Sequence, residues 1–232
     1  MSNIILPFKN DLGIKVDLNL DDIIQGIYKT IPETTCKNCG TCCKNGCPHI
    51  RMCEFAVLFN NFIKDIDPEI KKEVVQRCVE NFLSNDVVKP CPLLNKDNGC
   101  IVYKYRPSNC KTYGMIDKKE FKKRVKNAKK EFKEEFELLG LKKQCQDVRK
   151  DGKIFYLTTE DTDKLMKKLA HLDVAFGAPS VEGLVSYRTF HDWVMLKIFG
   201  EEKLCSFTEF KLKATKEAKD SLIKEIIKKL TV

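Results

Sequence analysis

One short segment, residues 36–48, dominates the sequence and reads Cys36-Lys37-Asn38-Cys39-Gly40-Thr41-Cys42-Cys43-Lys44-Asn45-Gly46-Cys47-Pro48. Its cysteine spacing lets several thiolates converge on one soft ion or cluster without closing a long loop. Gly40 and Gly46 allow tight bends that present backbone N–H groups to sulfur. The segment therefore predicts a metal centre. Its predicted ligands are Cys36, Cys39, Cys42 and Cys43, with Cys47 as an auxiliary candidate.

The spacing narrows the kind of metal centre. A radical-SAM cluster requires C-x3-C-x2-C, and a zinc ribbon requires two separated C-x2-C pairs, which this chain lacks. A bacterial ferredoxin has C-x2-C-x2-C-x3-C-P, and residues 36–48 match it except for one extra residue before Cys47. The doubled cysteine is the remaining anomaly. Because adjacent side chains usually diverge, Cys42 and Cys43 are expected to serve different sites.

The chain as a whole favours metal binding over disulfides. Ten of its twelve cysteines lie between Cys36 and Cys110. The N-terminus has no basic region of a signal peptide, and no stretch approaches the roughly 20 apolar residues of a membrane span. We therefore expect a cytoplasmic protein without membrane contact, whose thiols stay reduced. The net charge of +9 is compatible with an anionic partner, but we favour the solvated faces of lysine-rich helices as its explanation.

A second group of cysteines follows at wider spacing. Cys91, Cys100 and Cys110 are nine and ten residues apart, which by itself identifies no site. Together with the first four cysteines they provide seven thiols, whereas one tetrahedral zinc or one [4Fe–4S] cluster needs four. The surplus leaves three alternatives: two metal sites, a larger cluster, or one site with an additional reactive thiol.

The combined pattern resembles a known family. C-x2-C-x2-C-C, then C-P-x-L, then G-C-x-[IV]-Y-x2-R-P-x2-C-x2-[YF] is similar to the YkgJ-type cysteine-cluster family of zinc- or iron-chelating proteins. The resemblance covers roughly residues 33–115. It implies metal binding, with iron–sulfur favoured over zinc, and an oxidoreductase role. The same motif occurs in flagellin lysine-N-methylases, so a protein-modifying role is also implied. Matching positions are Cys36, Cys39, Cys42, Cys43, Cys91, Cys100, Tyr103, Arg106, Pro107, Cys110 and Tyr113.

Two of these matching residues are expected beside the metal rather than bound to it. Arg106 is predicted to hydrogen-bond sulfur or neutralise thiolate charge, which would tune the reduction potential. Tyr103 is predicted to support the ligands by packing or hydrogen bonding.

The rest of the sequence predicts a mainly α fold with minor β structure, in which helices surround an irregular cysteine-rich core. Asp67 and Pro68 have the composition of a helix start, and Cys78 falls on the apolar face of that helix. Residues 100–103 have the composition of a short strand, and Gly200 is expected to end a helix over 187–199. We divide the chain into a metal-binding portion, 1–115, and a basic helical portion, 116–232, which could form one continuous domain.

Three functions fit these observations. The first is an iron–sulfur protein that acts in electron transfer or in cluster-dependent modification, with a protein redox partner or a protein substrate. The second is a zinc-stabilised module that binds protein or nucleic acid through the basic helix around Arg124, although apolar residues at helical spacing there favour packing over nucleic-acid stacking. The third is a metal or cluster delivery protein.

Overall fold

The computed structural model describes residues 18–34, 36–44, 46–86, 89–116, 118–132, 149–150, 153–154, 156–176 and 187–230. Its helices are α1 (Leu18–Tyr28), α2 (Thr41–Lys44), α3 (Met52–Asp65), α4 (Pro68–Leu83), the 3-10 helix η1 (Tyr103–Tyr105), α5 (Ser108–Lys111), α6 (Lys118–Phe132), α7 (Thr159–Ala175), α8 (Phe190–Lys213) and α9 (Lys216–Leu230). Its strands are β1 (His49–Arg51), β2 (Arg149–Lys150), β3 (Lys153–Ile154) and β4 (Tyr187–Thr189). The predicted mainly α fold with minor β structure is confirmed.

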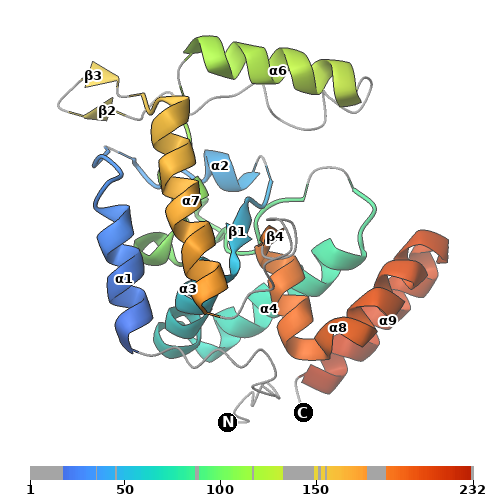
Figure 1. Cartoon of the computed structure of the whole chain (residues 1–232). Coiled ribbons are helices and arrows are strands. Elements are labelled where there is room, and N and C mark those ends of the chain that lie inside the picture. Colours follow the sequence, from blue (N-terminus) through green and yellow to red (C-terminus); the bar gives the residue numbers. More distant parts are fainter. Residues whose placement is uncertain are drawn as a thin grey trace.

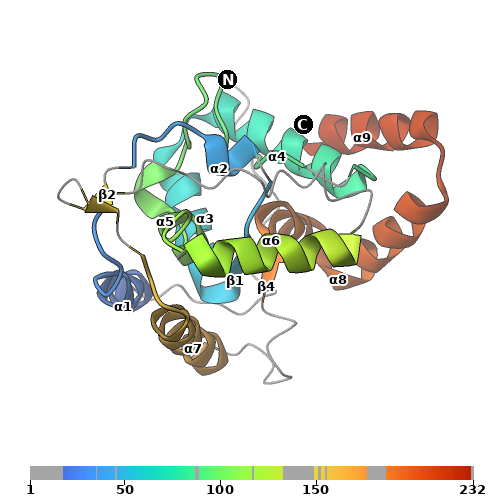
Figure 2. The ribbon, with the colours of Figure 1, turned by 90° about the horizontal axis from the view of Figure 1, so that it is seen from above.

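The helices form two groups, one on either side of a centre that consists of α3, α4 and the strand pair β1–β4 (Figure 1). On one flank, α1 and α7 pack against α3, and on the other, α8 and α9 pack against α4. Between them β1 pairs antiparallel with β4, with Ile50 opposite Arg188. Seen from above, α6 extends along one end of the molecule, over α5 and β1 (Figure 2). Within the described residues, no helix combines the length and apolar character needed to cross a membrane.

The core joins the two predicted portions of the chain. Phe55 of α3 stacks on Trp193 of α8 with ring centroids 5.5 Å apart, and the Trp193 Nε1–H donates to the Ile50 carbonyl at 3.0 Å. Cys43 and Cys91 belong to the same buried cluster as these aromatic rings. The cysteine-rich segments therefore rest directly on the hydrophobic core.

Several local expectations can be compared with the structure. The Asp67 side chain accepts a hydrogen bond from the Glu69 N–H at the start of α4, and Cys78 is fully buried, as predicted. Gly200 interrupts α8 with φ of 76°, after which the chain returns to helix. The predicted strand over 100–103 is wrong. Only Cys100 forms a bridge, with Leu94, and the chain then turns into η1 because the Tyr105 N–H bonds back to the Val102 carbonyl.

Glu54 is a polar residue inside the core and connects three segments. It is 2% exposed, and its Oε1 accepts hydrogen bonds from the Tyr28 hydroxyl and the Ser108 N–H, each at 2.6 Å. Its Oε2 accepts from the Arg51 N–H at 3.2 Å, which completes the start of α3. One carboxyl group thus fixes α1, α3 and α5 to one another.

We expect Glu54→Gln to lower the free energy of unfolding by about 1–3 kcal/mol, because the amide N–H₂ of glutamine would face at least one buried N–H or O–H donor that needs an acceptor. Urea unfolding of the full chain measures this loss. Glu202→Gln, on an exposed face of α8, is the matched control and should stay within about 0.5 kcal/mol of the parent. Equal stability of both variants would contradict the role assigned to Glu54.

Candidate metal centre

The first cysteine segment turns sharply because three of its residues adopt positive φ angles. Asn38 has φ of 53°, Gly40 of 69° and Gly46 of 139°. At Gly40 a side chain is excluded by contact as well as by conformation, since an added Cβ would lie 2.0 Å from the Asn98 carbonyl oxygen. The glycine therefore lets the first segment approach the backbone of the second.

Hydrogen bonds join the two cysteine segments along their length. The Cys91 N–H donates to the Cys43 carbonyl, and the Cys100 N–H donates to the Asn38 Oδ1, each at 2.8 Å. The Tyr103 hydroxyl donates to the Cys36 carbonyl at 2.9 Å. These bonds place cysteines that are distant in sequence on the walls of one cavity.

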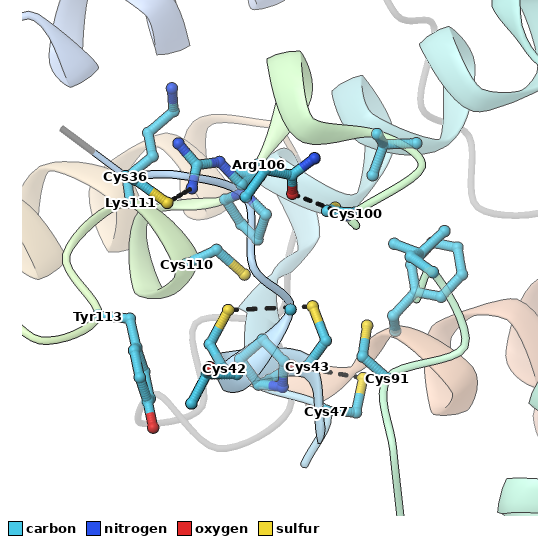
Figure 3. Close-up of a pocket in the computed structure, with 18 of the residues that line it drawn as sticks. Cys36, Cys42, Cys43, Cys47, Cys91, Cys100, Arg106, Cys110, Lys111 and Tyr113 are labelled. Atoms are coloured by element: carbon cyan, nitrogen blue, oxygen red, sulfur yellow. Dashed lines mark hydrogen bonds between the residues drawn. The ribbon is translucent and has the colours of Figure 1, made fainter. Parts of the chain in front are cut away.

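That cavity has a volume of about 50 Å³, several times the roughly 10–15 Å³ needed by one water molecule. Figure 3 shows thiols from both segments facing it. The remaining wall is largely apolar and includes Ile50, Leu58 and Phe190. The cysteines that line it are Cys36, Cys39, Cys42, Cys43, Cys47, Cys91, Cys100 and Cys110.

The structure thus brings together the seven predicted ligands and the auxiliary Cys47; their binding of metal stays a prediction. Three other cysteines lie elsewhere. Cys53 is buried in α3, where its thiol donates to the Leu169 carbonyl at 3.7 Å, Cys78 is buried in α4, and Cys205 is exposed on α8. Cys145 lies outside the described residues.

The adjacent cysteines Cys42 and Cys43 do not diverge as expected. Their sulfur atoms are 3.9 Å apart on the single turn of α2 (Figure 3). Two thiolates bound to one tetrahedral ion at about 2.3 Å would be separated by about 3.8 Å, so this spacing suits neighbouring metal ligands. Among the described residues, no three Cys, His, Asp or Glu side chains already stand as a complete ion-binding group.

Arg106 contacts the first cysteine directly. Its Nη1 donates to the Cys36 Sγ at 3.2 Å, its Nε donates to the Tyr103 carbonyl at 3.0 Å, and its guanidinium carbon lies 3.6 Å from the centre of the Tyr103 ring. Burial by itself raises the pKa of Cys36, but hydrogen bonds with Tyr103 and Arg106 and the arginine charge outweigh it and lower that pKa. Cys36 is therefore prepared to ionise.

The other cysteines fall into different electrostatic environments. The Thr41 hydroxyl, 3.2 Å from the Cys39 sulfur, lowers the pKa of Cys39 by hydrogen bonding. The pKa of Cys42 is raised by its hydrogen bond with Cys43, and that of Cys43 is raised by its hydrogen bond with Cys100. Burial raises the pKa of Cys110. Metal binding at these thiols must therefore displace protons, so affinity should increase with pH.

The donor set suits a soft metal. The cavity wall contains thiols but no carboxylate or imidazole among its described residues, whereas Mg²⁺ and Ca²⁺ require oxygen ligands. Thiolates are the preferred ligands of zinc, copper(I) and iron–sulfur clusters. The residues present therefore fit either of the two predicted groups, a zinc ion or an iron–sulfur cluster.

Sequence reasoning missed two residues that shape this centre. Asn38 supports Cys100 through its side chain, and Lys111 lines the cavity beside Arg106. The burial of the Lys111 side chain, together with the Arg106 charge, lowers its pKa. An asparagine between two cysteines of a tight turn is a recognisable signal for positive φ, but no local pattern indicates the position of Lys111.

Comparison with known proteins agrees with the geometry. Residues 35–134 match the CxxCxxCC family model, whose description is "Putative zinc- or iron-chelating domain". The match includes both cysteine segments and continues beyond residue 115, where the resemblance was expected to end, through α6. Comparison with curated proteins and with solved structures gives no match.

We expect Gly40→Ala to destabilise the metal-free protein by about 1–3 kcal/mol, because the residue has a positive φ and a Cβ would collide with Asn98. Gly26→Ala is the control: Gly26 lies within α1 with no atom near an added Cβ, so that change should be neutral or stabilising by up to about 1 kcal/mol. Urea unfolding distinguishes the two, and equal effects would contradict the close approach at Gly40.

We expect Arg106→Gln to slow alkylation of Cys36 severalfold near pH 7 in the metal-free protein. The folded-state pKa of Cys36 is lowered, so the thiolate forms at lower pH than usual; removing the guanidinium raises the pKa and reduces the thiolate fraction. Iodoacetamide labelling followed by peptide mass spectrometry measures the rate.

Lys104→Gln removes an exposed cation from η1, two residues before Arg106, and should leave the Cys36 rate unchanged. The exposed Cys205 provides an internal reference. Equal slowing in both variants, or none in Arg106→Gln, would show that Arg106 does not activate Cys36.

Proposed function

We propose that this chain is an iron–sulfur protein in which thiols around the cysteine cavity hold a cluster and Arg106 adjusts its charge environment. The observation that supports this proposal most strongly is the hydrogen bond, 3.2 Å long, from the Arg106 guanidinium to the Cys36 sulfur. A cation that hydrogen-bonds a ligand sulfur tunes the reduction potential of a redox centre, whereas a zinc ion has no redox chemistry to tune. Eight cysteines line the cavity, which is more than the four thiols that one [4Fe–4S] cluster needs.

A bound iron–sulfur cluster would supply one-electron chemistry. The protein's own groups would control it. The Arg106 hydrogen bond to the Cys36 sulfur withdraws electron density from that ligand, which favours the reduced state and raises the reduction potential. Cys39 is exposed at the edge of the cavity, so the part of the cavity wall that contains Cys39 offers a short path for an electron to a bound partner.

A protein partner or protein substrate fits the surface beside the cysteines. A second cavity of about 490 Å³ shares Thr34, Arg106 and Lys111 with the cysteine cavity. Its wall also includes Lys29 and one carboxylate, Glu33, so cationic side chains outnumber anionic ones. The Lys111 ammonium lies 5.1 Å from the centre of the Tyr28 ring. These cations favour an acidic side chain of the partner, and the proposal places the protein in the cytoplasm, where exposed thiols such as Cys39 stay reduced.

The two alternative functions, a zinc-stabilised module and a delivery protein, would depend on other features of the chain. A zinc module that binds protein or nucleic acid would use the exposed lysines of α6, among them Lys122, Lys126 and Lys129. A delivery protein would have to release its metal to an acceptor. Neither alternative requires the hydrogen bond between Arg106 and Cys36, and that contact favours the redox proposal.

We expect the full chain, purified without oxygen, to be brown and to contain about four iron atoms and four sulfides, or a multiple of these. The visible spectrum should bleach on reduction with dithionite. Cys42→Ser should lose most of the iron because Cys42 faces the cavity, whereas Cys205→Ser should retain it. Arg106→Gln should retain iron but show a lower reduction potential.

A colourless, iron-free protein loaded with zinc would overturn this proposal and leave the zinc-stabilised module. Transfer of the intact cluster to a metal-free acceptor protein, without a redox change, would instead favour the delivery role.

A further inference from the structure

Two cationic side chains form part of the wall that the cysteine cavity shares with the second cavity of about 490 Å³. These are Arg106 and Lys111. In Figure 3 one terminal nitrogen of Arg106 reaches the Cys36 sulfur, whereas the other terminal nitrogen and the Lys111 ammonium point away from the sulfur atoms. The shared wall therefore presents positive charge to the second cavity as well as to the metal centre.

The cations around the second cavity have no acidic partner from the described part of the chain. Among the residues that the structure describes, no carboxylate forms an ion pair with Lys29, Arg106 or Lys111. One carboxylate, that of Glu33, lies in the same wall and is exposed. Three cations beside one carboxylate give the cavity a positive potential, which attracts an anionic ligand.

Buried contacts fix the walls of the second cavity relative to one another. Tyr28 of α1 and the Ser108 N–H of α5 both donate to the Glu54 carboxyl group, each at 2.6 Å. Lys111 ends α5, and its ammonium lies 5.1 Å from the centre of the Tyr28 ring. Arg106 is held in place by two hydrogen bonds of its own. A ligand therefore meets side chains that are already positioned, which reduces the free-energy cost of ordering them.

The chemistry of this wall favours a carboxylate. The volume lies within the roughly 300–1,000 Å³ of ligand pockets. A guanidinium and an ammonium side by side suit the two oxygen atoms of a carboxylate, and Ile31 and Pro32 offer apolar contact to the carbon chain that bears it. A doubly charged phosphate would be repelled more strongly than a carboxylate by Glu33.

We propose that the second cavity binds a carboxylate through Arg106 and Lys111, and that Arg106 couples this site to the metal centre. The coupling rests on the proposed iron–sulfur function, whereas the carboxylate site does not. Because Arg106 also contacts the Cys36 sulfur, an anion on its other side offsets the positive charge that stabilises the reduced centre. Bound carboxylate therefore lowers the reduction potential.

Linkage gives this coupling a direction. If the carboxylate lowers the potential, the reduced protein must bind it more weakly by the corresponding factor. A tenfold difference in affinity would equal a shift of about 59 mV for a one-electron centre. An electron donor that carries an acidic group would thus bind the oxidised protein and be released after the electron has been transferred.

NMR titration of the full chain, metal-free and reduced, tests the carboxylate site without iron. The probes are the peptide acetyl-Gly-Glu-Gly-amide, propionate and inorganic phosphate. We expect both carboxylates to shift the amide signals of Thr34 and Lys111, with phosphate binding more weakly. Tighter binding of the peptide than of propionate identifies a protein side chain as the source of the carboxylate, and the reverse identifies a free small molecule.

Three substitutions with opposite expectations sharpen the test. Lys111→Gln should weaken peptide binding about tenfold, because it removes a charged hydrogen-bond donor. Glu33→Gln should tighten binding about two- to fivefold, because it removes the carboxylate of the wall, and a loss of folding cannot imitate this gain. Lys104→Gln is the control: its ammonium lies beside Tyr105 and in neither cavity wall, so binding should not change.

The carboxylate site would be overturned by a parent protein that binds neither carboxylate, or binds phosphate as tightly as the peptide. Equal binding by Lys111→Gln and Lys104→Gln would also overturn it, as would a Glu33→Gln variant that binds no more tightly than the parent.

The reduction potential of the iron-loaded protein tests the coupling separately. Peptide at a concentration that saturates the parent should lower the potential of the parent and have a smaller effect in Lys111→Gln. An unchanged potential in the parent would overturn the coupling and leave the carboxylate site. A protein that binds carboxylate but never acquires iron would overturn the iron–sulfur function, and the coupling with it, but not the site. The failures are therefore distinguishable.

Discussion

The buried carboxyl group of Glu54 is the contact on which the placement of the cysteine cavity depends. It accepts hydrogen bonds from Tyr28 in α1, from Arg51 at the start of α3 and from Ser108 at the start of α5. Because Cys110 lies in α5, the same carboxyl group positions one wall of the cavity against the core. Each N–H left unpaired in this interior would lower the free energy of unfolding by about 1–3 kcal/mol, so separation of the three segments is unfavourable. The site is therefore built outward from a polar contact inside the hydrophobic core.

From that base, the two cysteine segments are held together by their own backbones. The hydrogen bonds from Cys91 to Cys43 and from Cys100 to Asn38 form between atoms that carry no metal ligand function. They bring the thiols to one cavity by protein contacts alone, which reduces the entropy lost when a metal binds. The close contact at Gly40 contributes in the same way, since a larger residue would push the segments apart. Metal binding would therefore add stability to a fold that already has a hydrophobic core of its own around Phe55 and Trp193.

The sequence predicts this centre best where its chemistry is local. The spacing from Cys36 to Cys47 identifies the first set of thiols, and the start of α4 follows from Asp67 and Pro68. The contacts of Glu54 join residues 26 and 54 positions apart, so no local spacing reveals them, although a carboxyl group amid the apolar residues of α3 is a visible signal. The strand expected over 100–103 fails for a related reason. Its side chains favour a β-strand, but the contact of Cys100 with Asn38, which is distant in sequence, fixes a tight turn there instead.

The chain has more cysteines than one metal site needs, so only the tertiary structure shows which of them can reach the metal. Cys47 and Cys53 are both near the C-x2-C-x2-C-C segment, and both are additions to its pattern. Cys47 precedes β1 and faces the cavity, whereas Cys53 is the second residue of α3 and donates to the Leu169 carbonyl. The five residues between them include β1, which pairs with β4 and carries Ile50 in the cavity wall before the chain enters α3. A thiol on one side of that strand can reach a metal, and a thiol on the other side stabilises the helical core. The short strand pair is therefore what separates a candidate ligand from a structural cysteine.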